Sequence, residues 1–289
     1  MGGRRGTRAA VLLLFACGFA VFAIYYLGLK EGRPTFWPDT YEYAQVARNL
    51  ARGRGIETGT VSFAELWLLS RYPLPLPYLL HDSGNSVLMA ASFLILGVYD
   101  GAVAWGSGLA FACLPPLGFL LASRFFGRTV GLIAALLLLV HAQLLAFAAA
   151  GLSEVPYAAA LTLVLLLVSR PSGAPRSFFA GLAFGVTFGL RSNSLPFLPW
   201  LMLFLVLEPA DGSQSSPWKV RVPGLRTLLR RWLPFLAGFA ILFVPIALRN
   251  DRWLGRPLTH GAALDGAPGL DIHGAVANNR GPQEFLGFD

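Results

Sequence analysis

Apolar residues in this 289-residue chain are concentrated in long blocks, and polar residues separate one block from the next. A helix needs about 20 apolar residues to cross the ~30 Å hydrocarbon layer of a membrane. The first three blocks have this length, whereas the shortest later blocks need flanking residues or a place inside a bundle. The predicted spans are 9–29, 102–122, 130–150, 155–168, 178–190, 195–207 and 232–248. The pattern predicts an all-α, polytopic helical membrane protein with about seven transmembrane helices.

The composition agrees with a membrane protein and excludes an ordinary soluble domain. Hydrophobic residues make up 55% of the chain and charged residues 13%, against roughly 25% charged residues in soluble domains. The net charge of +8 raises the question of a nucleic-acid partner, but the positive residues lie in short loops between the apolar blocks. We therefore expect no nucleic-acid partner.

The loop charges predict the topology, because cytoplasmic loops of membrane proteins are enriched in Lys and Arg. The first block is too long for the core of a cleaved signal peptide, so we expect a retained signal anchor with its N-terminus in the cytoplasm. The basic, cytoplasmic loops are then 124–128, 170–176 and the stretch that carries Lys219, Arg221, Arg226, Arg230 and Arg231. The outer segments are 30–101, 151–154, 191–194 and 249–289. We divide the chain into a membrane domain, 1–248, and an extracytoplasmic tail, 249–289.

The long outer loop, 30–101, contains two apolar pieces of its own. Between Thr40 and Arg54, apolar residues recur at spacings of 3, 4 or 7, which is typical of an amphipathic helix at the membrane interface. Thr40 can cap this helix, and Gly53 and Gly55 can end it. The second piece, 87–98, is too short to cross and would invert every later loop, so we expect a second interfacial helix.

Ionisable residues near the outer membrane face are candidates for function, because charges at membrane depth are costly. Asp39 could accept a proton from an incoming nucleophile as a general base, or serve only as a carboxylate at a helix N-terminus. Glu154 could be a second acid in an outer cavity, or a first-turn acid beside a capping Ser153. Arg191 could hold a phosphate bidentately, or simply bind a lipid headgroup. The cluster at Arg249 and Asn250 is a further candidate.

The sequence assigns no cofactor, although it leaves a divalent metal open. None of the four histidines, His141 among them, has a second ligand at zinc-binding spacing. The two cysteines, Cys17 and Cys113, lie within apolar blocks and form no CxxC motif. No phosphate-binding GK[ST] loop and no GxSxG motif is present.

Taken in order, these pieces resemble the GT-C superfamily of membrane glycosyltransferases. The resemblance is to the group of dolichyl-phosphate-mannose–protein mannosyltransferases and bacterial aminoarabinose transferases. An Asp soon after the first span leads into YEYAQVARNL, similar to the family's run of Asp, Tyr, Ala and Asn-Leu. The later matching segments are 126–135, 152–154, 181–191 and 245–257. One departure is at 84–86, where the family usually has a basic residue or His with Pro-Pro, so one donor contact is expected to be missing.

The resemblance implies a protein of the cell's inner membrane that transfers a sugar from a polyprenyl-phosphate donor, within the membrane lipid, to an outer glycan, lipid or protein. It implies Asp39 as the base, Glu154 as the second acid and Arg191 at the donor phosphate. It further implies that the cavity is lined by Tyr41, Tyr43, Arg249 and Asn250. Family members are longer, which leaves open a short member, a split half or a truncated, non-catalytic subunit. The main rival is a transporter or flippase, which could use the same charges as a substrate path.

Overall fold

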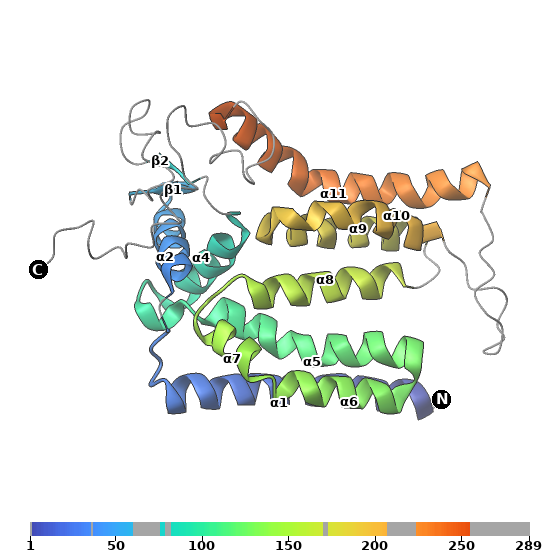
Figure 1. Cartoon of the computed structure of the whole chain (residues 1–289), viewed down its shortest axis with the longest axis horizontal. Helices are drawn as coiled ribbons and strands as arrows, with labels where there is room; N and C mark the ends of the chain where they lie inside the picture. Colours follow the sequence, from blue (N-terminus) through green and yellow to red (C-terminus); the bar gives the residue numbers. More distant parts are fainter. Residues whose placement is uncertain are drawn as a thin grey trace, which may run out of the picture.

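The computed structural model describes residues 2–35, 37–59, 76–78, 82–169, 173–206 and 224–254. Figure 1 shows an elongated helical bundle whose long helices lie along one axis, with the N-terminus at one end. The bundle consists of α1 (Gly2–Ala23, continued by a π-helix at Ile24–Leu29), α5 (Trp105–Phe126), α6 (Arg128–Leu139), α7 (Ala142–Ala149), α8 (Glu154–Val168), α9 (Ala174–Leu190), α10 (Leu198–Val206) and α11 (Leu225–Leu254). The end opposite the N-terminus carries α2 (Pro38–Ala51), α4 (Gly84–Leu96), β1 (Glu57–Thr58) and β2 (Leu76–Pro77).

In the part of the chain that the structure describes, each of the seven predicted spans is mostly helical, which confirms the all-α membrane class. Within the described residues, three segments are long and apolar enough to cross a membrane on their own, namely Gly6–Leu29, Asp100–Phe126 and Leu225–Arg252. The pair α6 and α7 would be a fourth span, whereas α8 and α10 are shorter apolar helices. By length and composition alone, three or four of the seven predicted spans are long enough to cross a membrane by themselves, and the shorter predicted spans remain a prediction.

The predicted third span, 130–150, is not one straight helix. The α6 and α7 helices meet at an angle of 51°, and His141 lies at the break between them. The backbone N–H of Leu144 donates to His141 Nδ1 at 3.3 Å, which caps the new helix start. The His141 side chain thus gives the backbone a hydrogen-bond partner at the point where α6 has ended and α7 begins.

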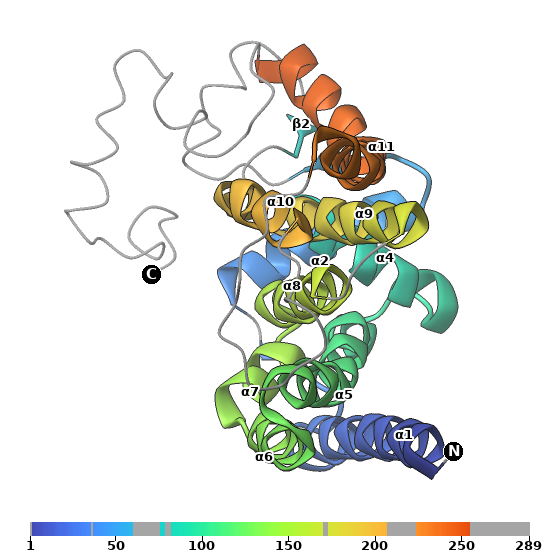
Figure 2. The ribbon, with the colours of Figure 1, turned by 90° about the vertical axis from the view of Figure 1, so that its right-hand side faces the viewer.

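Close contact between the helices depends on small residues and on buried aromatic rings. A Cβ atom at Gly181 would lie 1.9 Å from the carbonyl oxygen of Phe235, and one at Gly18 would lie 3.0 Å from Ala112 Cα. Glycine therefore brings α9 against α11 and α1 against α5, as small residues commonly do in membrane bundles. Viewed along the helices, α11, α9 with α10, α8 and α5 follow one another across the bundle, and α1 and α6 lie at its far side (Figure 2). The α8–α11 half has a core that includes the buried rings of Phe184 and Phe235.

Among the described residues, acidic side chains lie at only one end of the bundle, whereas basic side chains lie at both ends. At the end near the N-terminus, Arg124 and Arg176 donate to the last carbonyls of α8, Ser169 O at 2.7 Å and Leu167 O at 3.1 Å. Positive charge is favourable at a helix C-terminus, where these carbonyls lack helical partners. The acidic residues of the described segments belong to elements at the other end: Glu31, Asp39, Glu42, Glu57, Asp82, Asp100, Glu154 and Asp251.

The helix predicted between Thr40 and Arg54 is present as α2, but it begins earlier than the sequence predicts. Pro38 is its first residue, so Thr40 is not the residue before the helix but lies in its first turn. The Thr40 hydroxyl accepts the backbone N–H of Trp37 at 3.3 Å and donates to Ala150 O at 2.9 Å. The helix ends at Ala51, and Gly53, with φ of 74°, makes the turn that follows. The second interfacial piece is also helical, as α4, and packs on α2.

Candidate functional site

The centre of the polar site is the α7–α8 loop, residues 150–153, at the end of the bundle that carries α2 and α4. Its carbonyl groups are bonded by side chains from three different helices. Thr40 of α2 donates to Ala150 O, Asn85 of α4 donates to Gly151 O at 2.9 Å, and Ser107 of α5 donates to Leu152 O at 3.1 Å. All three donor side chains are buried. Because buried carbonyls need partners, these bonds fix where α8 begins.

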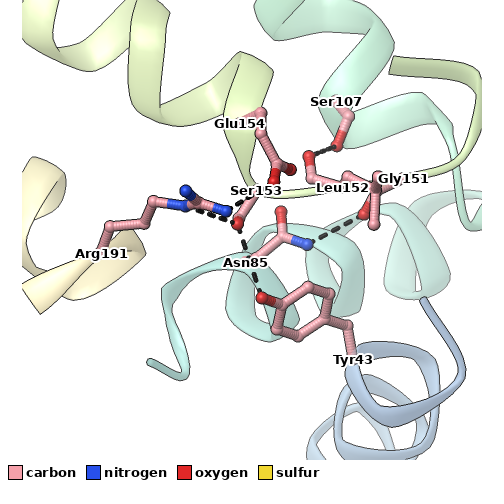
Figure 3. A network of polar contacts seen from close by, with 8 residues as sticks. All are labelled: Tyr43, Asn85, Ser107, Gly151, Leu152, Ser153, Glu154 and Arg191. Atoms are coloured by element: carbon pink, nitrogen blue, oxygen red, sulfur yellow. Dashed lines mark hydrogen bonds and ion pairs between the residues drawn. The ribbon is translucent and has the colours of Figure 1, made fainter. Parts of the chain in front are cut away.

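An ion pair between Arg191 and Glu154 lies next to this loop (Figure 3). Arg191 Nη2 is 2.5 Å from Glu154 Oε1, and Arg191 Nε donates to Ser153 Oγ at 3.2 Å. The side chains are 34% and 31% exposed, so a ligand at the protein surface can contact the pair. Glu154 Oε2, by contrast, is buried and has no hydrogen-bond partner among the described residues.

Tyr43 completes the cluster from the side of α2. Its hydroxyl donates to Ser153 Oγ at 3.5 Å, and its ring is buried. Burial raises the pKa of Tyr43 to about 12; the nearby charges of Asp39 and Glu154 also raise it, while the Ser153 hydrogen bond and Arg191 lower it. The phenol therefore stays protonated at neutral pH and acts as a hydrogen-bond donor.

Asp39 lies in the first turn of α2, next to Thr40, and is half-buried. Its negative charge lies close enough to Tyr43 to raise the pKa of that side chain. Tyr41 points away from Tyr43, because residues two apart lie on nearly opposite sides of a helix, and its side chain is 61% exposed. The structure thus brings Asp39 and Tyr43 to the site and leaves Tyr41 at the surface.

Arg249 and Asn250 lie near the end of α11, beyond the predicted span end at 248. Arg249 Nη2 donates to the backbone carbonyls of Ile56, at 3.3 Å, and Tyr78, at 2.5 Å. This side chain therefore ties α11 to the β1–β2 region. Asn250 is buried at the same helix end. Neither residue has a bond to the Arg191–Glu154 pair among the hydrogen bonds of the described segments.

Several contributors to the site are not among the candidates from the sequence. Asn85 was noted only as a departure from the family pattern, and Ser107 was not singled out. Asp82 also escaped notice, although its carboxylate accepts the backbone N–H of Ser192 at 2.6 Å and so joins the start of α4 to the end of α9. The signal for Asn85 and Ser107 is their polarity within or beside apolar blocks, since buried polar groups need partners.

One interpretation of Glu154 made Ser153 a capping residue, and Ser153 does lie at the N-cap position of α8. Its hydroxyl makes no capping hydrogen bond and instead accepts from Arg191 and Tyr43. In the described part of the chain, no three His, Cys, Asp or Glu side chains come together as a possible metal site. The arrangement therefore offers a guanidinium, a paired carboxylate, a phenol and a second, nearby carboxylate. Such a set suits an anionic ligand with a hydroxyl partner.

The comparison with known families gives a match in the membrane region. The sequence model described as dolichyl-phosphate-mannose-protein mannosyltransferase matches residues 85–248, more than half of the chain. No curated protein and no solved structure matches. The matched range includes Glu154 and Arg191 but begins after Asp39 and Tyr43. The chain thus belongs to the dolichyl-phosphate-mannose-protein mannosyltransferase family and is a multi-pass membrane glycosyltransferase of the GT-C type.

Proposed function

We propose that the protein transfers one sugar from a polyprenyl-phosphate donor to a glycan, lipid or protein acceptor outside the cytoplasm. The observation that carries this proposal is the Arg191 guanidinium, which Ser153 and Glu154 hold at the partly exposed end of the bundle. Arginine binds phosphate oxygens through two parallel N–H groups, which fixes both charge and orientation. Arg191 would therefore hold the phosphate of the donor.

An apolar cavity close to the cluster supports a donor that carries a lipid. The cavity has a volume of about 520 Å³ and is lined by side chains of α1, α5 and α8 and by Leu88 of α4. Leu88 is one helical turn from Asn85, and Gly106, also in the lining, is next to Ser107. Ala159 lies about five residues, or ~7.5 Å, along α8 from Glu154. An isoprenoid chain in this cavity would place its phosphate near Arg191.

The proposed reaction needs a base on one side of the sugar and a positive charge on the other. An acceptor hydroxyl attacks the anomeric carbon while the bond from that carbon to the phosphate oxygen breaks. Asp39 takes the proton from the hydroxyl, and the electron pair leaves with the lipid phosphate, whose growing negative charge Arg191 stabilises. Attack opposite the leaving phosphate inverts the anomeric configuration. Glu154 would be the second acid of the polar site, next to Arg191.

The basic residues of the short helix connections at the N-terminal end, such as Arg124 and Arg176, support the orientation. Basic residues at the N-terminal end would face the cytoplasm under the positive-inside rule. The end with α2, α4 and the Arg191–Glu154 pair would then face outward across the cell's inner membrane. A donor lipid in that leaflet presents its phosphate and sugar at this depth.

Sugar transfer in membranes from a radiolabelled polyprenyl-phosphate sugar tests the proposal. The wild type should transfer label to an acceptor, and Asp39→Asn should slow transfer by roughly 10²- to 10⁴-fold, the usual effect of losing a general base. Glu57→Gln removes a carboxylate at the same end of the bundle and serves as the matched control, with transfer unchanged. Equal rates for Asp39→Asn and wild type would remove Asp39 from the reaction. No transfer by the wild type would favour a non-catalytic subunit.

A further inference from the structure

The contacts of Arg191 with Ser153 and Glu154 occupy the Nε–Nη2 edge, one of the two edges at which a guanidinium can hold a phosphate. Arg191 Nη2 is 2.5 Å from Glu154 Oε1, and its Nε donates to Ser153 Oγ. A phosphate held bidentately by a guanidinium uses two neighbouring N–H groups in one plane. A phosphate bound on the Nε–Nη2 edge, which faces Ser153 and Glu154, would therefore replace Glu154 rather than join it.

The Glu154 carboxylate is held in place but is only partly satisfied. It belongs to the first residue of α8, whose start is fixed by the side chains bonded to the α7–α8 loop. One oxygen bonds Arg191, while Oε2 is buried with no partner in the described part of the chain. Leaving a charged acceptor unbonded is unfavourable, so the ion pair is weaker than a fully bonded one. An external anion therefore displaces this carboxylate from Arg191 at a smaller cost in free energy.

We propose that Glu154 is a built-in competitor of the lipid phosphate for Arg191. This inference rests on the proposed function. In the empty site, Glu154 keeps the guanidinium in position; the donor phosphate displaces it, and the carboxylate returns to Arg191 when the lipid phosphate leaves. The residue thus sets how strongly the site binds phosphate and makes binding reversible.

The charges of donor and product explain how this competition would help the product to leave. The donor is a phosphodiester with one negative charge, whereas the released lipid phosphate is a monoester with a charge of about −1.5 to −2 at neutral pH. A lone Arg191 would therefore bind the product more tightly than the donor. A carboxylate that competes for the same guanidinium, and repels the dianion, favours release of the product.

Equilibrium binding of farnesyl phosphate, with the neutral alcohol farnesol for comparison, tests the inference in purified full-length protein. Glu154→Gln keeps the size of the side chain and removes the competing charge. It should bind farnesyl phosphate roughly 10- to 100-fold more tightly than the wild type, the strength of about one charged hydrogen bond. Farnesol binding should stay the same. Glu57→Gln, the control for a lost carboxylate at this end of the bundle, should bind farnesyl phosphate as the wild type does.

Two further variants keep the test decisive. Glu154→Asp retains the charge but shortens the side chain, so it should fall between wild type and Glu154→Gln; it also serves if Glu154→Gln does not fold. Adding Arg191→Ala to Glu154→Gln should abolish the gain. If the wild type prefers phosphate to alcohol but neither Glu154 variant binds more tightly, the competition is refuted and the donor proposal stands. If no variant prefers the phosphate, both proposals fail.

Discussion

Replacing Thr40 by Val should loosen the joint between α2 and the α7–α8 loop. Thr40 is fully buried, and its hydroxyl donates to Ala150 O at 2.9 Å and accepts the N–H of Trp37 at 3.3 Å. Valine has nearly the same shape but no hydroxyl, so both backbone groups lose this partner. A buried carbonyl left without a hydrogen bond costs about 1–3 kcal/mol, which is the loss expected in the free energy of unfolding.

The same substitution should also slow sugar transfer. Asp39 directly precedes Thr40, and the bond to Ala150 O fixes the first turn of α2 against the loop that leads to Glu154. With this bond gone, Asp39 is no longer held at one distance from the Arg191–Glu154 pair. Misplacing a reacting group by about 1 Å can cost on the order of 10²-fold in rate, so a clear fall in transfer is expected.

Thr187→Val is the matched control, because Thr187 is equally buried and its hydroxyl donates to a carbonyl at the same distance. That acceptor, Ala183 O, belongs to the same helix, where the backbone N–H of residue 187 already bonds it. The control should therefore lose less than about 1 kcal/mol. Unfolding by SDS titration in detergent micelles, with transfer measured in membranes, compares the two variants. Equal losses of stability and activity would refute the special role of the Thr40 bond.

Three further outcomes are expected. Arg191→Ala should weaken polyprenyl-phosphate binding more than Arg191→Lys, which keeps the charge but loses the bidentate geometry, and equal binding by wild type and the Ala variant would exclude Arg191. Reporter fusions after residues 126 and 173 should be cytoplasmic and those after 60 and 270 outside; a cytoplasmic signal at 60 or 270 would overturn the topology. Because burial raises the pKa of Tyr43 from 10.0 to about 12, its protonated form stabilises the fold below pH 10, and this contribution is lost as the pH rises towards 12. In a pH series of unfolding measurements, Tyr43→Phe should lose less stability between pH 10 and 12 than the wild type, and parallel curves would contradict this.

The helices could be predicted because lipid offers the backbone no hydrogen-bond partners. Backbone N–H and C=O groups in a membrane must bond within the segment, so an apolar block of sufficient length becomes a helix. The break at His141 was not predicted, because one polar residue changes the mean hydropathy of a long apolar block very little. The early start of α2 was missed for a related reason: Pro38 suits the first helical position, but the search for a cap favoured the next polar hydroxyl, Thr40.

Three charged members of the site could be singled out from the sequence one at a time, but the buried polar members Asn85 and Ser107 and the contacts could not. Asp39, Glu154 and Arg191 stand out as charges beside apolar blocks. The pairing of Glu154 with Arg191 follows from topology, because α8 and α9 are consecutive helices and the start of one lies near the end of the next. The bonds of Asn85 and Ser107 to the α7–α8 loop depend on how distant helices pack. No spacing in the sequence contains that information.

The two sides of the site come from differently placed parts of the chain. Glu154 and Arg191 lie inside the segment that matches the family, residues 85–248, and Asp39 lies outside it, on α2. What joins them is the α7–α8 loop, since its carbonyls are bonded from α2, α4 and α5 at once. A change that frees α2 from this loop would leave the phosphate side intact and displace the proposed base. Under the proposed function, loss of the Thr40 bond should therefore reduce sugar transfer while donor binding is retained.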